Sequence, residues 1–347
     1  MNLMLTDQRA FWAEYQNEPM PDETPGDYHL DADEICQRLN GLKRGQIHHD
    51  TATIVAFIDI QGTSLWFTVC GFASDFTGWL IDYGAFPHQQ GRPYYTTDDI
   101  RETLATAYPG AALEGQIYGG LRDLVKELAG RTYQTPTGLK AKLELCLIDF
   151  NWHESTDVVF DFCQASKYGH LLLPSRGQFI GPRSKPMDKW AAKKGEKAGP
   201  GWRLSAPSRR SVRFVTMDVN GWKSKMAERL QTPMGDPGGL TLFGKDPQVH
   251  QMFADHCTAE TCTVQGEDRG RRVGVWKMMF GRDNHLWDGL VGCGVGASIQ
   301  GCAIAADAQS EGKHHRGKSI KSALKPTKRR KVSFADLHKK AKQDSGK

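Results

Sequence analysis

The sequence predicts an α/β protein whose central mixed sheet starts as an antiparallel three-strand meander and continues with parallel strands flanked by helices. Two observations lead to this fold class. Three apolar, strand-like runs follow one another with short breaks rich in Gly, Ser, Asp and Thr, over residues 53–61, 64–72 and 78–86. After them, segments with helical spacing of apolar residues alternate with further short apolar runs. The first pattern is typical of hairpins, and the second of strands joined by crossing helices.

The region before the sheet, residues 1–50, is predicted to hold two short helices and a linker. Residues 7–18 place Phe11, Trp12 and Tyr15 toward one side of a helix. An acidic, proline-rich linker follows, and a second short helix is expected over 31–42. The main domain is therefore predicted to begin at residue 51 and to extend to residue 310.

Helices and strands alternate after the meander. Helices are expected over 99–107, 116–129 and 155–167, and strands over 143–150 and 170–174. This order matches the ribonuclease H-like fold, in which the first and fourth strands pair in parallel at the sheet centre. That pairing would place Asp59 and Asp149, which end these two strands, side by side.

The second half of the chain begins with a basic insertion at residues 174–210. This segment is rich in Gly, Pro, Ser, Lys and Arg, and we expect a long polar loop. Further elements are predicted to complete the domain: a strand at 211–218, helices at 220–230 and 246–256, strands at 259–265 and 271–276, and a helix at 284–306. Small residues on one side of this last helix allow close packing on the sheet.

Three aspartates at the ends of elements are the candidate catalytic and metal-binding residues. Asp59 ends the apolar run IVAFIDIQ, Asp149 ends LELCLIDF, and Asp288 opens the last helix. A carboxylate beside an apolar sheet is costly unless it is paired or coordinates a cation. Asp59 alone could be an ordinary strand-end acid, but three acids from separate elements favour a divalent-metal site. Asp283 is the alternative third acid, and its other interpretation is a helix N-cap.

Positive charge is concentrated in two stretches of a chain whose net charge is +5. Residues 311–347 hold 13 Lys/Arg against 3 acids, and residues 183–213 hold 10 against 2. Such a distribution fits a polyanion, most simply DNA or RNA. We expect the C-terminal stretch to be a disordered basic tail, for which a purely solubilising role is the competing interpretation.

The remaining composition indicates a cytoplasmic protein with a real core. Hydrophobic residues make up 39% of the chain, with no long uncharged apolar stretch and no signal-peptide pattern at the N-terminus. The eight cysteines are scattered without a C-x-x-C pair, so we interpret them as reduced thiols. A zinc site from Cys257, Cys262 and His256 is a weak alternative, because the spacing matches no closed ligand set.

Five segments in order resemble the nuclease domain of the lambda-type phage terminase large subunit. They are the stretch 53–84 with IDIQ and WLIDYG, then LIDFNWHESTDVVFDFC, FVTMDVNGWKSKMAERL, HQMFADHCTAE and DNHLWDGLVG. The earlier RAFWAEYQNEP resembles the connector that follows the ATPase motor in this family. The resemblance covers roughly residues 8–306. One departure is that Phe150, Asn151 and Trp152 follow the second acid, where the family usually has small residues.

The resemblance implies a metal-dependent DNA endonuclease that cuts concatemeric phage DNA during packaging. Asp59, Asp149 and Asp288 match the family's acidic positions, with Asp59 bridging two Mg²⁺ or Mn²⁺ ions and the others each holding mainly one. Expected partners are double-stranded DNA, a separate ATPase motor chain, a small terminase subunit and a portal, in the host cytoplasm and without a membrane. Alternatives are another ribonuclease H-like nuclease of the resolvase type, or a non-catalytic DNA-binding packaging component.

Several other residues are weaker candidates. DNA-backbone contacts are predicted for Arg183, Lys185, Lys193, Lys194, Arg209, Arg210 and Lys223. His153 follows Asp149 and could orient a water, although a surface-loop role is the favoured interpretation, whereas the role of His285, beside the acids, is left open. The aromatic residues Trp66, Phe67, Trp79 and Tyr83 are expected in the sheet core rather than as platforms for bases.

The string from Gly312 to Ser319 satisfies the phosphate-loop pattern G-x-x-x-x-G-K-[ST], but no nucleotide site is predicted there. A phosphate loop needs a buried strand before it and a helix after it. Here the preceding residues are AADAQSE, and a basic run broken by Pro326 follows. The chain is therefore not expected to carry its own ATPase motor.

Overall fold

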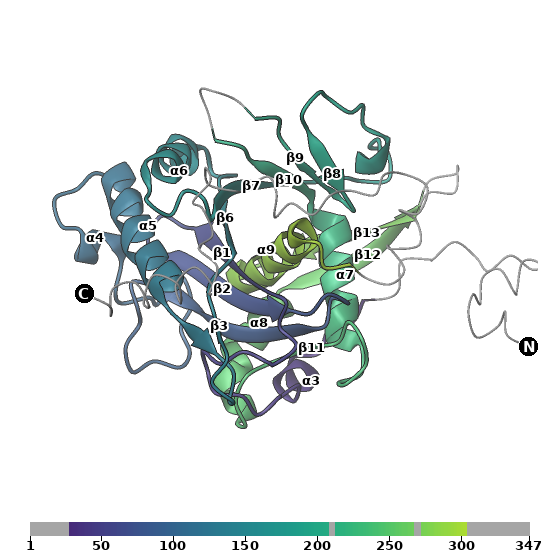
Figure 1. Ribbon diagram of the computed structural model, residues 1–347, viewed down its shortest axis with the longest axis horizontal. Coiled ribbons are helices and arrows are strands. Elements are labelled where there is room, and N and C mark those ends of the chain that lie inside the picture. Colours follow the sequence, from purple (N-terminus) through teal and green to yellow (C-terminus); the bar gives the residue numbers. More distant parts are fainter. Residues whose placement is uncertain (1–27, 208–211, 267–271, 304–347) are drawn as a thin grey trace, which may run out of the picture.

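The computed structural model describes residues 28–207, 212–266 and 272–303, and in these residues a nine-stranded mixed sheet is covered by helices on both faces (Figure 1). The strand order is β11-β3-β2-β1-β6-β7-β10-β9-β8. The predicted helix at 7–18, the basic tail and the phosphate-loop string lie outside the described residues.

The elements have the following bounds. The large sheet holds β1 (Thr53–Ile60), β2 (Leu65–Phe72), β3 (Gly78–Phe86), β6 (Leu145–Asp149), β7 (Leu172–Gln178), β8 (Lys197–Gly199), β9 (Trp202–Leu204), β10 (Val215–Asp218) and β11 (Leu240–Thr241). Two small hairpins pair β4 (Tyr133–Gln134) with β5 (Lys140–Ala141) and β12 (Glu260–Gly266) with β13 (Arg272–Met278). The helices are α3 (Ala32–Cys36), α4 (Leu104–Ala107), α5 (Leu113–Gly130), α6 (His153–Ala165), α7 (Val219–Gln231), α8 (Gln251–Cys257) and α9 (His285–Gln300).

The strand order confirms the predicted ribonuclease H-like arrangement at the centre of the sheet. β1, β2 and β3 form the antiparallel meander, and β1 pairs in parallel with β6, which in turn pairs in parallel with β7. Because successive side chains of a strand point to opposite faces, β1 contributes to two separate cores. Val55 and Phe57 pack with α9, whereas Ile54, Ala56 and Ile58 pack with α5 and α6.

Helix α9 lies directly on the sheet because glycines form its contact face. A β-carbon at Gly289 would overlap Thr68, one at Gly292 would overlap Phe57, and one at Gly296 would overlap Val55. These positions recur at helical spacing, so the backbone of α9 approaches β1 and β2 along its length. The predicted close packing of this helix is confirmed.

Several boundaries differ from those predicted. The helix expected over 99–107 begins only at Leu104, because Gln89 Oε1 accepts hydrogen bonds from the Arg101 and Glu102 amides at 2.8 and 3.1 Å. α3 ends at Cys36, well before residue 42. α9 ends at Gln300, because the next residue, Gly301, has a φ of 99° and caps the helix before residue 306.

The insertion at 174–210 was expected to be a loop, but part of it extends the sheet. β7 runs to Gln178, and β8 and β9 form a hairpin that pairs with β10. Trp202 and Leu204 of β9 are both buried, since alternate residues of this short strand face the core. These two apolar residues, two positions apart, were the signal for a strand in an otherwise polar segment.

Candidate functional site

Asp59 lies at the end of β1 on the face covered by α9. It shares this face with Val55 and Phe57 because the side-chain period of a strand is two. The side chain is buried, and its Oδ2 accepts hydrogen bonds from Gln61 Nε2 at 3.0 Å and from His285 Nδ1 at 2.7 Å. The first candidate acid is therefore held from two sides.

Asp149 ends β6, the strand next to β1, on the same face. The register pairs Ile58 with Ile148, so the following residues, Asp59 and Asp149, come together as predicted. Burial and the negative charges of Asp59 and Asp288 raise the pKa of Asp149 well above its ordinary value. The backbone amide of Asn151 donates to its Oδ2 at 3.2 Å, so the bulky residues that follow this acid still form a turn that binds it.

Asp288 lies in the first turn of α9, and its contacts come from one other helix, α7, and from Asn284, the residue that precedes its own helix. It accepts from Lys223 Nζ of α7 at 2.9 Å and from Asn284 Nδ2 at 3.1 Å. Burial raises its pKa; the ammonium of Lys223 opposes this effect, while the charges of Glu260 and Asp59 add to it. Because the charge of Asp59 raises the pKa of both Asp149 and Asp288, the three acids form one electrostatic cluster.

Lys223 and Glu260 form the buried ion pair of this cluster. Lys223 was predicted to contact DNA phosphates, but it is 5% exposed and pairs with both Glu260 and Asp288. Burial alone would lower the pKa of Lys223, yet the two carboxylates outweigh this effect and raise it. Glu260, at the start of β12, also accepts from Asn284 at 2.6 Å. Nothing in the pattern around Glu260 or Asn284 indicated a site, because their roles depend on contacts between distant segments.

Asp283 has a different position from the three clustered acids. Its Oδ2 accepts from the backbone amide of Thr97 at 2.7 Å, so this side chain binds the segment before α4. His285 joins the two groups, because its Nδ1 contacts Asp59 and its Nε2 lies 3.0 Å from Thr97 Oγ1. Burial tends to lower the pKa of His285, but the hydrogen bond and charge of Asp59 raise it overall. This geometry favours Asp288 over Asp283 as the third acid.

His285 contacts Asp59 and Lys223 contacts Asp288, so side chains of the protein pair with two of the three carboxylates. Among the described residues, the group with three ligand atoms all within 4.8 Å of one another is His48, His49 and Asp50, and not the three acids. Cys257, Cys262 and His256 form no such group either, and His256 Nδ1 instead accepts from the Leu286 amide at 3.2 Å. The weak zinc alternative is therefore unsupported.

The predicted DNA-contacting residues of the insertion are exposed where the structure describes them. Arg183, Lys185, Lys193 and Lys194 all face solvent, whereas Arg209 and Arg210 lie outside the described residues. Arg203 holds this segment against the sheet by donating to the Met187 and Trp190 carbonyls at 3.0 and 2.6 Å. The insertion follows β7, the neighbour of the strand that carries Asp149.

The aromatic residues of the sheet are part of the core, and His153 lies at the surface. Trp66, Phe67, Trp79 and Tyr83 are all buried, as expected for core aromatics. His153 is exposed at the start of α6. No helix within the described ranges is both long and apolar enough to cross a membrane.

Comparison with known proteins provides an independent classification. No curated protein matches the sequence significantly. Among solved structures, a lysine-to-alanine mutant of the nuclease domain of the large terminase subunit gp2 of bacterial virus Sf6, solved with manganese, is similar at 10% identity and a TM-score of 0.37. That match covers 76% of this chain and 97% of the other. The family model described as the terminase large subunit gpA endonuclease domain matches residues 6–308. The chain therefore belongs to the family of terminase large-subunit endonuclease domains.

Proposed function

We propose that this domain cuts double-stranded DNA by two-metal phosphodiester hydrolysis at Asp59, Asp149 and Asp288. The observation that carries the proposal is the convergence of three carboxylates on one sheet face, one of which has a strongly raised pKa. Two acids come from adjacent parallel strands, and the third comes from the helix that lies across them. Such crowding is unfavourable in a purely structural site, but it suits divalent cations.

The donor set fits Mg²⁺ or Mn²⁺, because hard cations prefer carboxylate oxygens. Asp59 would bridge two ions; its hydrogen bonds to Gln61 and His285 both use Oδ2, so Oδ1 lies outside those contacts. Asp149 and Asp288 would each hold mainly one ion. The buried hydroxyl of Ser175, which pairs in register with Asp149, has no hydrogen-bond partner among the described residues and could bind an ordered water there.

The protein's own groups would position the carboxylates and balance their charge. When bound, the divalent ions would stabilise negative charge on the attacking and leaving oxygens of the phosphodiester. His285 fixes the orientation of Asp59, and Lys223 fixes that of Asp288 while Glu260 holds the ammonium. The raised pKa of Asp149 means that protons compete with a metal ion for this carboxylate more strongly than at an ordinary aspartate.

We propose that the exposed basic residues of the insertion contact the DNA backbone beside this site. The insertion starts next to the strand of Asp149, and its charges at Lys193 and Lys194 face solvent. Each phosphate contact should steepen the salt dependence of binding, by a log–log slope of about −0.9 on duplex DNA. Lys193→Glu combined with Lys194→Glu should therefore flatten the slope in a filter-binding titration, whereas an unchanged slope would remove these residues from the DNA path.

The proposed setting is genome packaging in the host cytoplasm. The partners would be concatemeric DNA, an ATPase motor chain, a small terminase subunit and a portal. A resolvase-type activity would instead show as preferential cleavage of branched DNA over linear duplex. A non-catalytic DNA-binding component would bind DNA without cutting it.

A plasmid-nicking assay with matched variants tests the proposal. Asp59→Asn, Asp149→Asn and Asp288→Asn should each reduce Mn²⁺-dependent nicking by about 1,000-fold or more, since each removes a charge that the ions need. Asp283→Asn is the control, because this acid binds the Thr97 amide instead, and it should retain most activity. Full nicking by the Asp59 variant, or equal loss in the Asp283 variant, would overturn the assignment.

A further inference from the structure

A second group of metal-ligating side chains lies at the opposite end of β1 from the acid site. His48, His49 and Asp50 form a turn just before the strand begins at Thr53, whereas Asp59 lies near its other end. A strand rises about 3.3 Å per residue, so roughly 20 Å separates the two ends. This cluster is therefore distinct from the three acids and plays no part in the proposed cleavage.

The distances in this cluster match the edges of a tetrahedral metal site. Asp50 Oδ2 lies 3.3 Å from His49 Nε2 and 3.6 Å from His48 Nδ1. Ligands at about 2.0–2.1 Å from a tetrahedral zinc ion are about 3.3–3.4 Å from one another. The separations are also longer than the 2.7–2.9 Å or so of a direct charge-assisted hydrogen bond. The two distances from Asp50 thus match the edges of such a site, and all three ligand atoms lie within 4.8 Å of one another.

The turn is held in this shape by contacts that do not involve a metal. The His48 ring stacks on Trp79 of β3 with ring centroids 4.4 Å apart and an interplanar angle of 13°. The Thr51 amide donates to the His48 carbonyl at 3.2 Å, and the next residue, Ala52, joins the sheet edge through Phe72. These contacts fix the direction of the chain on both sides of Asp50, so the ligand atoms are pre-positioned.

The donor atoms also have suitable chemistry. The Asp50 amide donates to His48 Nδ1 at 3.3 Å, so this nitrogen carries a lone pair, and a bound ion would take the place of this weak hydrogen bond. Two imidazoles and one carboxylate suit zinc and its late first-row neighbours, whereas Mg²⁺ prefers sites built from oxygens alone. A surface cavity of about 500 Å³, lined by His48, Asp50, Asp75 and Trp79 among others, gives solvent access to the fourth coordination position.

We propose that His48, His49 and Asp50 bind one late-transition divalent metal ion, of the Zn²⁺ class, with water as the fourth ligand. The ion would fix three consecutive residues of the turn that precedes β1, whose His48 ring stacks on Trp79. Its expected effect is on the stability of this turn rather than on cleavage, because the site lies away from the acids.

Calorimetric titration of the full chain with ZnCl₂ tests this site, with excess Mg²⁺ present to occupy the acid cluster. The wild type should bind one equivalent, and His48→Gln combined with His49→Gln should weaken this binding by at least about 30-fold, within the effects known for altered metal sites. The matched control is His314→Gln combined with His315→Gln, the other adjacent histidine pair of the sequence. This control should bind as the wild type does. Unchanged Mn²⁺-dependent nicking in both double variants would show that they fold.

Two further measurements make the result decisive. Co²⁺ in place of Zn²⁺ should give visible absorption bands of a four-coordinate site in the wild type and in the His314/His315 control, but not in the His48/His49 variant. Zn²⁺ should also raise the melting temperature of the wild type but not of that variant. The proposal is overturned if the wild type binds no Zn²⁺, if the His48/His49 variant binds it equally well, or if the His314/His315 control loses it.

Discussion

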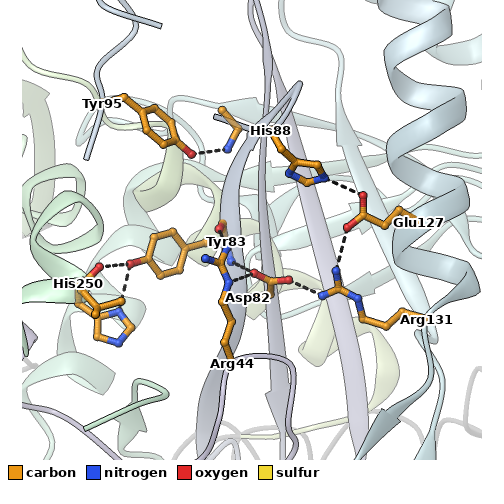
Figure 2. A network of polar contacts seen from close by, with 10 residues as sticks. Arg44, Asp82, Tyr83, His88, Tyr95, Glu127, Arg131 and His250 are labelled. Atoms are coloured by element: carbon orange, nitrogen blue, oxygen red, sulfur yellow. Dashed lines mark hydrogen bonds and ion pairs between the residues drawn. The ribbon is translucent and has the colours of Figure 1, made fainter. Parts of the chain in front are cut away.

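Two buried aspartates of the same sheet, Asp59 on β1 and Asp82 on β3, have opposite surroundings. Asp59 is 7% exposed and faces α9, in a cluster with Asp149 and Asp288. Asp82 is 4% exposed and faces α5, because a bulge at Ile81 turns it to the side of Val69. Its Oδ1 accepts from Arg44 Nε at 2.6 Å, and its Oδ2 accepts from Arg131 Nη1 (Figure 2).

The difference lies in charge balance rather than in burial. Around Asp82 the charges alternate, since Arg131 also pairs with Glu127 at 2.8 Å and Glu127 contacts His88 at 2.8 Å (Figure 2). Around Asp149 two further carboxylates raise the pKa, and no equivalent guanidinium is part of that cluster as described. The two guanidinium groups at Asp82 are typical of a structural acid, whereas the two further carboxylates beside Asp149 indicate a site for an added cation.

The largest expected effect is on stability at the Asp82 network. Asp82→Asn should lower the free energy of unfolding by about 3 kcal/mol, because it removes both ion pairs and leaves two cations facing an amide. The control is Asp99→Asn, which breaks the 2.5 Å pair with Arg92 at a carboxylate that is 54% exposed. That change should cost about 0.5 kcal/mol. Urea unfolding of both variants measures the difference, and equal losses would show that the ion pairs of Asp82 stabilise the fold no more than an exposed pair does.

Asp149→Asn should raise the free energy of unfolding of the metal-free protein, whereas Asp82→Asn lowers it. Removing one of three clustered carboxylates relieves repulsion, so stability in the presence of a chelator should rise by about 1 kcal/mol. An asparagine can still accept the hydrogen bond from the Asn151 amide. The same variant should lose the Mn²⁺-dependent rise in melting temperature. A lower melting point without metal would show that Asp149 is a structural acid like Asp82.

The pH dependence of this effect follows from the raised pKa of Asp149. The carboxyl of an unfolded Asp ionises at about pH 3.9. Above that pH, Asp149 has released its proton in the unfolded state but still holds it in the folded state, up to its raised pKa. Metal-free stability should therefore fall as the pH rises from about 4 through the raised pKa. In the presence of a chelator, the melting temperatures of the wild type and of Asp149→Asn should approach each other below about pH 4 and differ increasingly above it. Parallel profiles at all pH values would contradict the raised pKa.

The smallest expected effect is at the outer end of the Asp82 network. The hydrogen bond that His88 donates to Glu127 raises the pKa of His88, so the pair stabilises the fold below the ordinary histidine pKa, and this stabilisation is lost as the pH rises through the raised value. The His88 side chain is 44% exposed, and solvent screens the interaction. His88→Gln should therefore cost about 0.3 kcal/mol at pH 6 and nothing measurable at pH 9. A larger loss that persists at pH 9 would mean that His88 acts through packing.

The sequence was sufficient to predict that Asp59 and Asp149 lie side by side, but not which side chains pair with the acids. Asp59 and Asp149 were predictable because each ends a buried strand, and strand periodicity with the fold order determines which face they share. Lys223 and Glu260 were not, because they are 37 residues apart and meet only when α7 and β12 pack together. Likewise, Asp82 and Asp59 have the same strand-embedded pattern in sequence. Only the positions of Arg44 and Arg131 in the folded protein separate their roles.

The glycine face of α9 has a consequence for how the acids are spaced. The glycines determine how closely α9 lies to β1 and β6. They therefore also determine how far Asp288 lies from the two acids of these strands, although they carry no charge. Gly292 lies one turn beyond Asp288, about 6 Å along the helix axis. A single methyl group there would push against the Phe57 ring and lift the helix. Uncharged substitutions at the glycines of this face would therefore change the spacing of the carboxylates and, with it, the proposed affinity for metal ions.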